Sequence, residues 1–300
     1  MESSVGVSLK GKMLKSLIKS MRLRTLPLSL AGVVCGGLLA IGEQGGGWWA
    51  FVLVLLTACL LQILSNLSNE LGDHLSGVDG EGREGPNYSM ADGGLTVKQM
   101  WRAINGTVVA CCVSGLVMVL VSGCPWWVLL LGAAAIWAAT HYTLGKNPYG
   151  YIGLGDLFVF IFFGLVSVLG SYFVVAHAIE WRVLPPACGI GLLSVAVLNV
   201  NNIRDMQSDE GLRKTIPLRF GRKRAVWYQS LLIALGWGIM VAATGNGWMV
   251  LTALPFYIHL YGVCRREGRR LDPMLPLLVI STFVLAVLYV IAVWPTISTP

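Results

Sequence analysis

The chain has 300 residues, of which 55% are hydrophobic and only 12% are charged. A soluble globular protein carries about twice that charged share, and a core of this size cannot bury so much apolar surface. The composition therefore excludes an ordinary soluble enzyme, a disordered chain and a fibrous repeat, and it predicts an all-α membrane protein. The net charge of +7 does not indicate nucleic-acid binding, because Lys and Arg lie in short clusters between apolar stretches.

The apolar stretches divide the chain into a short basic N-terminal segment and one membrane domain. Residues 1–23 are basic and are expected to form a cytoplasmic N-terminal segment, with residues 24–300 as a single transmembrane domain. A bilayer needs roughly 20 apolar residues per helix, and nine stretches qualify. These nine expected spans are 26–43, 48–68, 100–122, 125–144, 154–176, 183–203, 225–243, 247–264 and 273–295.

The positive charges set the orientation of these spans. Nine spans place the two termini on opposite sides of the membrane. Of the 22 Lys and Arg residues, 21 then fall on the N-terminal side and only Arg182 falls on the other. Cytoplasmic loops carry the excess of Lys and Arg, so the N-terminal side is predicted to be cytoplasmic and the C-terminus to lie opposite.

Polar residues recur with one spacing at the ends of the second and sixth spans. Asn69 and Asp73 are four residues apart, and Asn201 and Asp205 repeat that spacing. Residues four apart lie on one face of a helix. Both clusters are predicted on the cytoplasmic side, where the loops 69–99 and 204–224 are the long ones.

Two further acids extend the clusters. Asp209 follows Asp205 by one more turn, whereas Asp79 lies beyond Gly77, where the helix is expected to break. Hard oxygen ligands on two helices suit Mg²⁺, which also binds water and substrate phosphate. Nearby cations would complement an anion: Lys146, Arg204, Arg213 and Lys214. The clusters predict a diphosphate held through Mg²⁺; the alternative is that the acids are solvated loop residues neutralised by adjacent Lys and Arg.

The two clusters, their placement and the span count resemble the UbiA superfamily of intramembrane aromatic prenyltransferases. The resemblance covers about residues 20–295. It implies a nine-helix bundle with its active site at the cytoplasmic side, in the plasma (inner) membrane of a bacterium and in contact with membrane lipid.

A finer resemblance is to the branch that prenylates 1,4-dihydroxy-2-naphthoate in menaquinone biosynthesis. Six stretches carry it, and the fourth is the most specific to the branch. They are 22–27 (Arg-Leu-Arg-Thr-Leu-Pro), 69–79, 83–86 (Arg-Glu-Gly-Pro), 148–156 (Pro-Tyr-Gly-Tyr-Ile-Gly-Leu-Gly-Asp), 201–205 (Asn-Asn-Ile-Arg-Asp) and 214–215 (Lys-Thr), which ends the second motif region.

Four positions depart from that branch. Glu70 and Leu71 stand where Asp and Tyr are frequent, and the implied chemistry is unaffected because Asn69 and Asp73 remain. Tyr88 and Asp92 occupy a stretch where a basic and an uncharged residue are expected.

The resemblance implies a Mg²⁺-dependent prenyl transfer. A polyprenyl diphosphate ionises, and the allylic cation alkylates 1,4-dihydroxy-2-naphthoate with loss of CO₂ and diphosphate, giving demethylmenaquinone. The implied ligands of one metal ion are Asn69, Asp73 and Asp79, and those of the other are Asn201, Asp205 and Asp209.

The resemblance also implies roles around the metal ions. The implied catalytic residues are Asp73, Asp205, Asp156 and Tyr149. The implied substrate-binding residues are Lys146, Arg204, Lys214, Tyr142, Tyr151, Arg22 and Arg83. Lys146 is the first candidate for a diphosphate clamp, with Arg204 and Lys214 as alternatives.

Several of these residues also have a structural interpretation. Asp156 either caps the fifth span or orients a hydroxyl of the acceptor. Arg22 either anchors the first span to the membrane surface or contacts the acceptor's carboxylate. The rings of Tyr142, Tyr149 and Tyr151, with Phe160, either stabilise the allylic cation or form an interfacial belt.

Two other functions are compatible with parts of the sequence. The same scaffold could serve another acceptor, such as 4-hydroxybenzoate, homogentisate or haem, and the stretch 148–156 favours the naphthoate. A secondary transporter is expected to carry its acids near the bilayer midplane, in inverted repeats. Here the acids gather at one face, so a transporter is disfavoured.

Overall fold

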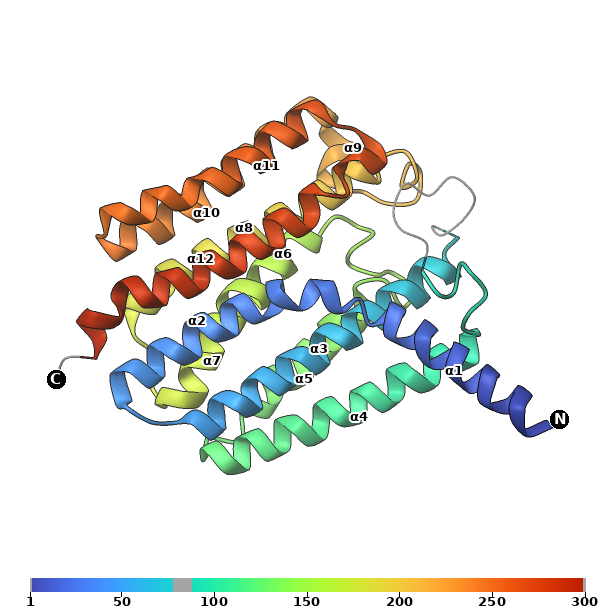
Figure 1. The fold of residues 1–300 in the computed structure, drawn as a ribbon, viewed down its shortest axis with the longest axis horizontal. Helices are drawn as coiled ribbons and strands as arrows, with labels where there is room; N and C mark the ends of the chain where they lie inside the picture. The colour runs from blue at the N-terminus through green and yellow to red at the C-terminus, as the bar shows by residue number, and fades with distance from the viewer. Residues whose placement is uncertain (1, 78–87, 299–300) are drawn as a thin grey trace.

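The computed structural model describes residues 2–77 and 88–298, which form a bundle of helices lying side by side (Figure 1). None of these residues lies in a β-strand. The basic N-terminal segment is itself helical, as α1 (Glu2–Ser20). Helix α1 lies at one end of the bundle, and the last turn of α12 (Met274–Ile297) lies at the other (Figure 1).

Helices account for every expected span. The remaining long ones are α2 (Leu26–Gln44), α3 (Trp48–Leu75), α4 (Val97–Ser122), α5 (Val128–His141), α8 (Leu184–Arg204), α10 (Arg222–Thr244) and α11 (Ala253–Arg265). The fifth span is one continuous run of α6 (Gly155–Val159), the π-helix η2 (Phe160–Val166) and α7 (Ser167–Ala176). Short helices are η1 (Leu23–Thr25), η3 (Trp181–Val183), α9 (Ile216–Phe220), η4 (Gly247–Thr252) and η5 (Gly268–Leu271).

The expected count of nine spans requires one qualification. Eight helices of the described chain are long and apolar enough to cross a membrane. The expected span 125–144 is the shorter helix α5, whose 14 residues measure about 21 Å against a hydrocarbon core of about 30 Å. The difference arises because the chain leaves the helix after His141 and turns back through residues 142–154.

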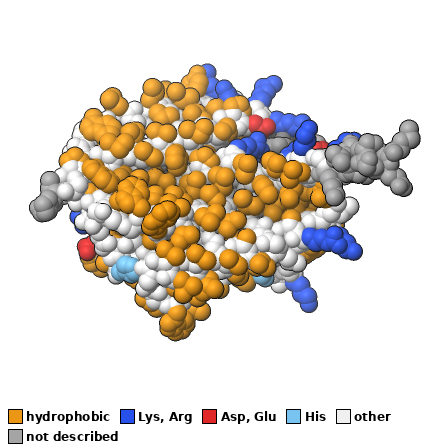
Figure 2. All heavy atoms as spheres, turned by 60° about the horizontal axis from the view of Figure 1, so that its bottom comes forward, with side chains coloured by type: hydrophobic (Ala, Val, Ile, Leu, Met, Phe, Trp, Pro, Cys, Tyr) orange, Lys and Arg blue, Asp and Glu red, His pale blue; other side chains and the backbone are white. Residues whose placement is uncertain are grey.

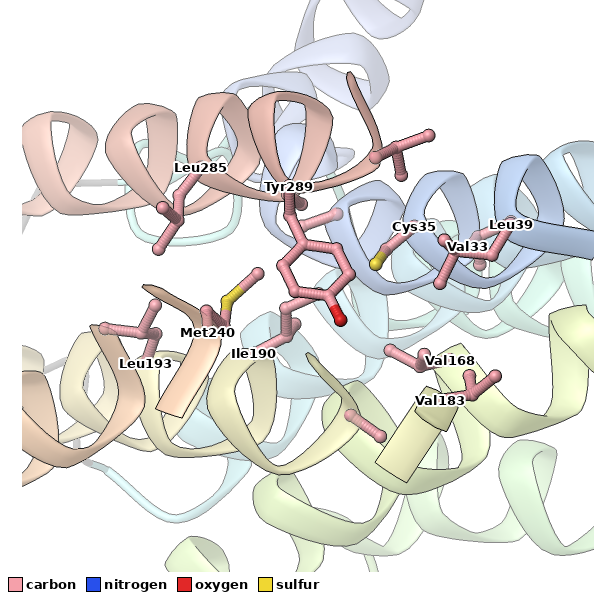
Figure 3. Packing of buried hydrophobic residues seen from close by; sticks show 14 of the residues in the cluster. Val33, Cys35, Leu39, Val168, Val183, Ile190, Leu193, Met240, Leu285 and Tyr289 are labelled. Atoms are coloured by element: carbon pink, nitrogen blue, oxygen red, sulfur yellow. The ribbon is translucent and has the colours of Figure 1, made fainter. Parts of the chain in front are cut away.

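The helices pack in pairs around a common core. Helix α8 contacts α10 and η2, α2 contacts α7 and α12, and α3 contacts α4. At the centre, Tyr289 of α12 projects between Cys35 of α2, Ile190 of α8 and Met240 of α10 (Figure 3). Lipid is as apolar as these side chains, so close van der Waals packing holds such helices together.

Glycines permit the closest approaches in this core. A Cβ on Gly36 of α2 would lie 2.1 Å from the main-chain oxygen of Val168 on α7. A Cβ on Gly164, in the π-helix η2, would lie 2.6 Å from the Cα of Gly191 on α8. These contacts bring the fifth span against the first and sixth spans, and they position the side chains that line the site described below.

The surface has the composition of a multi-pass membrane protein. Figure 2 shows a face dominated by hydrophobic side chains, with Lys and Arg gathered toward one end of the molecule. At the opposite end, the indoles of Trp49, Trp126 and Trp181 are 77%, 72% and 87% exposed. Amphipathic rings in such positions are typical of the membrane–water interface.

The packing of Gly36 generates a test. Gly36→Ala is expected to lower stability by about 1–3 kcal/mol, because its Cβ meets main chain that cannot move aside alone. The matched control is Gly238→Ala on α10, where nothing lies within 4 Å of the added Cβ and helix propensity favours Ala. Thermal unfolding in detergent measures both; equal shifts in Tm would contradict the close α2–α7 contact.

Candidate active site

The first cluster lies on the last turns of α3. Asn69 and Asp73 both line a cavity inside the bundle, as their spacing predicts. Glu70, between them in sequence, is fully buried, and its Oε1 accepts a hydrogen bond of 2.9 Å from the main-chain N–H of Met90. Glu70 therefore ties the segment after residue 87 to α3.

The second cluster lies at the end of α8. The guanidinium of Arg204 donates from Nε to Asp205 Oδ1 and from Nη2 to Asp205 Oδ2, at 2.7 Å each. Arg204 Nη2 also donates to Asn201 Oδ1 at 2.8 Å. Asp209 follows in the next turn, where its main-chain N–H donates to the Asp205 carbonyl at 2.9 Å, and it is buried. The acids of this cluster are thus fixed by one arginine and by the local backbone.

Arg213 joins the two clusters. It forms an ion pair with Asp73, 140 residues earlier in the chain, and its Nη1 lies 3.7 Å from Asp209 Oδ2. The hydroxyl of Tyr151 donates to Asp73 Oδ1 at 2.9 Å, and the ring of Tyr151 lies 4.7 Å from the Arg213 guanidinium carbon. The ends of the second and sixth spans therefore meet at one place.

Burial and charge determine the protonation of these groups. Burial alone would lower the pKa of Arg213, but the carboxylates of Asp73 and Asp209 outweigh it, so the pKa is raised and Arg213 stays cationic. Burial and the neighbouring Asp73 raise the pKa of Tyr151 to about 12. Tyr151 therefore keeps its proton at neutral pH and acts as the donor to Asp73.

The donor set fits a divalent ion that shares its coordination shell with substrate. Within residues 2–77 and 88–298, no three His, Cys, Asp or Glu side chains lie close enough to hold a metal ion by themselves. The site offers carboxylates and amides from two helices, with Asn201 Nδ2 and Asp205 Oδ2 3.3 Å apart. Such oxygens suit an ion that binds few protein ligands and takes the rest from water and phosphate.

The turn after α5 completes this end of the cavity. The hydroxyl of Thr143 donates to the Ser68 carbonyl at 2.9 Å and lies 3.3 Å from Asn69 Oδ1. Gly72 leaves space for this turn, since a Cβ there would lie 2.4 Å from Thr143 Oγ1. The early end of α5 thus lets loop residues reach the first cluster.

The cavity has a volume of about 880 Å³ and runs from the two clusters to the opposite end of the bundle. Its far end is lined by Trp127, just before α5, and by Phe173, in the last turn of α7. Their ring centroids lie 5.1 Å apart. The cavity is therefore polar at one end and apolar along its remaining length.

Aromatic rings line the wall between these two ends. Tyr149 stacks on Phe158 with centroids 4.1 Å apart, and Tyr142 meets Tyr149 edge-on at 5.4 Å. All three residues line the cavity. The hydroxyl of Tyr149 donates to the Ala138 carbonyl at 2.7 Å, so this residue offers its ring rather than its hydroxyl to the cavity.

Five of the residues expected at the site lie outside the cavity lining: Tyr151, described above, Phe160, Asp156, Lys146 and Lys214. Asp156, in the first turn of α6, accepts a hydrogen bond of 3.0 Å from the hydroxyl of Tyr228 on α10. Lys146 and Lys214 are exposed. The main chain of Lys214 nevertheless serves the site, because its N–H donates to the Tyr151 carbonyl at 2.9 Å.

The loop after the first cluster is described only in part. The expected site residues Asp79 and Arg83 lie outside the described residues. Tyr88 is buried and lines the cavity, beside Arg22 and Arg24. Asp92 instead forms an exposed ion pair with Lys19.

Sequence reasoning missed a polar network deeper on α3. Gln62 Nε2 donates to Asn66 Oδ1 at 3.1 Å, and Asn66 Nδ2 donates to Thr25 Oγ1 at 3.0 Å and to the Met21 carbonyl at 2.8 Å. All but Met21 line the cavity. The signal was present in the sequence, because Gln62, Asn66, Asn69 and Asp73 follow one another at steps of four, three and four residues, which places them on one helical face.

Comparisons with known proteins find similar sequences over most of the chain. The sequence model of the UbiA prenyltransferase family matches residues 29–272. The chain is 40% identical over 278 residues to the 1,4-dihydroxy-2-naphthoate octaprenyltransferase of Escherichia coli (strain K12), with 86% of each chain covered. It is 36% identical over 264 residues to the enzyme of that name from Mycobacterium tuberculosis, covering 86% of this chain and 89% of that one.

Solved structures share the fold. A UbiA homologue from Archaeoglobus fulgidus bound to DMAPP and Mg²⁺ matches with a TM-score of 0.67 at 15% identity, covering 95% of this chain and all of that one. An apo UbiA homologue from Aeropyrum pernix matches with a TM-score of 0.68 at 16% identity, covering 90% and 98%. These likenesses confirm the predicted all-α membrane architecture.

The bridge formed by Arg213 yields a test that does not depend on activity. Arg213→Gln leaves Asp73 and Asp209 without this counter-charge, so stability in a chelator is expected to fall by about 3 kcal/mol. Added Mg²⁺ should raise the Tm of the variant more than that of the parent, because a divalent ion replaces the lost charge. Arg102→Gln, on the exposed start of α4, is the control. The absence of any Mg²⁺-dependent rise in Tm in parent and variant would show that no divalent ion binds between the clusters.

Proposed function

The chain belongs to the UbiA prenyltransferase family, and we propose that it transfers a polyprenyl group from polyprenyl diphosphate to 1,4-dihydroxy-2-naphthoate. CO₂ and diphosphate are lost, and the product is demethylmenaquinone. The observation that carries the proposal is the cavity, which joins two meeting clusters of Asn and Asp to a long apolar channel. Relatives named for this reaction, at 34–40% identity over most of the chain, support the choice of acceptor.

The polar end of the cavity suits the diphosphate. Asn69 and Asp73 on one side, and Asn201, Asp205 and Asp209 on the other, would hold Mg²⁺, with Asp79 as a further expected ligand. Bound Mg²⁺ supplies positive charge to the diphosphate as it leaves.

Arginines of the described chain complement that charge. Arg213 and Arg204 line the cavity beside the acids, so they take the diphosphate-binding role in this proposal. Lys146 and Lys214 are exposed and outside the cavity, and the proposal gives their side chains no direct contact with the diphosphate. Tyr151 holds Asp73 in place through its hydroxyl.

The apolar length of the cavity suits the prenyl tail and protects the cation. A dry channel keeps water from an allylic cation, which water would convert to a prenyl alcohol. The ring faces of Tyr142, Tyr149 and Phe158 lie on the cavity wall next to the polar end, where they stabilise positive charge. Asp156 is held by Tyr228 outside the cavity, so its role here is to join α6 to α10.

The same features support a location and an orientation. The chain is a multi-pass membrane protein, and the proposal places it in a bacterial plasma membrane with its clusters facing the cytoplasm. Lys and Arg gather toward one end of the molecule (Figure 2), as the positive-inside rule requires of the cytoplasmic end. The acceptor is ionic and water-soluble, so the cytoplasmic side is where it is met.

The direct test is product formation by the purified protein. With 1,4-dihydroxy-2-naphthoate, prenyl diphosphates of several lengths and Mg²⁺, mass spectrometry should detect the prenylated, decarboxylated product, and a chelator should abolish it. Asp73→Asn and Asp205→Asn should each lower turnover by about 100- to 1,000-fold without loss of folding. Asp92→Asn, in an exposed pair with Lys19, is the control.

Other results would redirect the proposal. Product with 4-hydroxybenzoate, homogentisate or haem in place of the naphthoate would reassign the acceptor. Near-normal turnover of both cluster variants would remove the metal assignment. Absence of product with every acceptor, alongside substrate uptake into vesicles, would favour a transporter.

A further inference from the structure

Arg22 has an unusual main-chain conformation. It lies between α1 and η1 with φ 48° and ψ 50°, and only one other described non-glycine residue, His177, has a positive φ. The left-handed region costs an L-residue roughly 1–2 kcal/mol, so it persists only where the surroundings enforce it.

The surroundings of Arg22 do enforce it. Its carbonyl accepts hydrogen bonds of 2.9 Å from both the N–H and the hydroxyl of Thr25. Asn66, on α3, donates to the carbonyl of Met21 at 2.8 Å and also to Thr25 Oγ1. The chain is therefore fastened to α3 on both sides of Arg22, and the Arg22 side chain lines the cavity.

The guanidinium of Arg22 rests on an aromatic platform. Its carbon lies 3.5 Å from the ring centroid of Tyr88, and the Tyr88 hydroxyl accepts a hydrogen bond of 3.2 Å from Arg24 Nη2. Tyr88 is buried and lines the same cavity as Arg204 of the second cluster. The platform thus places Arg22 close to the reacting end of the cavity.

One edge of this guanidinium carries two donors that face no described acceptor. Nε and Nη2 of Arg22 are both buried, and neither is hydrogen-bonded within residues 2–77 and 88–298. Buried polar groups are almost always satisfied, so this pair calls for a ligand. Arg204 shows what the same edge binds, because its Nε and Nη2 hold the two oxygens of Asp205 at 2.7 Å. Parallel donors of this kind match a carboxylate.

We propose that Arg22 binds the carboxylate of the aromatic acceptor through Nε and Nη2, on a platform that Tyr88 forms and Arg24 braces. The inference rests on the proposed function and adds the site that selects a carboxylated ring. Arg204 and Arg213 are paired with acids of the two clusters, whereas Arg22 has no acid partner among the described residues. The point where Asn66 fastens the chain lies seven residues, or roughly 10 Å, from Asp73 along α3. The carboxylate site is therefore separate from the diphosphate ligands but shares their cavity.

The experiment compares two ligands that differ only in the carboxylate. Equilibrium binding of 1,4-dihydroxy-2-naphthoate and of naphthalene-1,4-diol is measured on the full-length protein without prenyl diphosphate, and acceptor KM is measured with it. Arg22→Gln should weaken binding of the naphthoate by about 10- to 100-fold and leave binding of the diol unchanged. Arg22→Lys should fall between, because it keeps the charge but loses the two-donor edge.

The controls separate recognition from folding. Gln is no more strained than Arg at a positive φ, so the substitution does not change the main-chain cost. Arg265→Gln is the matched control, because Arg265 also stacks on a tyrosine, Tyr261 at 4.4 Å, but is exposed and outside the cavity. If Arg22→Gln fails to fold, the Arg22→Lys comparison decides alone.

Three results would overturn the inference. Equal losses for the naphthoate and the diol would make Arg22 a structural residue. A rise in the KM for prenyl diphosphate, with acceptor binding unchanged, would assign Arg22 to the diphosphate. Unchanged binding of both ligands would leave Arg22 without a role in recognition. Because ligand binding is measured without turnover, an inactive parent protein would contradict the proposed function and still allow the carboxylate site to be judged.

Discussion

The ion pairs of Arg213 with Asp73 and Asp209 are the contact that brings the two clusters into one site. Acids gathered at the polar end of the cavity repel one another, and unpaired they would favour separation of α3 from the loop after α8. Arg213 supplies a charge between them, and Arg204 does the same for Asp205 within its own helix. These ion pairs hold the acids in position but add little to the net stability of the fold, because the cost of desolvation offsets most of the Coulombic gain of a buried pair.

Sequence reasoning predicted the parts of the site that depend on local spacing. Asn69 with Asp73 and Asn201 with Asp205 were found because four-residue spacing within a helix is visible in one dimension. In the sequence, Arg213 is only one of several cations near the clusters, and Lys146 is the first candidate for the diphosphate clamp. Nothing in a charge pattern says which cation folds inward; the ion pair with Asp73 joins residues 140 positions apart and exists only in the assembled bundle.

The fold, like the site, was predictable where it depends on local sequence and not where it depends on contacts between distant segments. Hydropathy located the nine spans, and the comparisons confirm the family and the all-helical membrane architecture. It overestimated the span at 125–144, because a window of apolar residues does not register that the chain turns after His141. It also gave no indication of the π-helix at Phe160–Val166, which accompanies the close contact of Gly164 with α8. Both features follow from packing against distant segments.

The early end of α5 affects how an ionic aromatic compound and a hydrophobic isoprenoid reach the same site. Because the helix stops short, residues 142–154 dip toward the bundle interior and place Thr143 against the end of α3. An ionic aromatic compound arriving from the aqueous phase then has a short path to the polar end of the cavity. A hydrophobic isoprenoid can remain among the acyl chains of the lipid. Reaction would take place where the two phases adjoin, so neither compound has to dissolve in the solvent that suits the other.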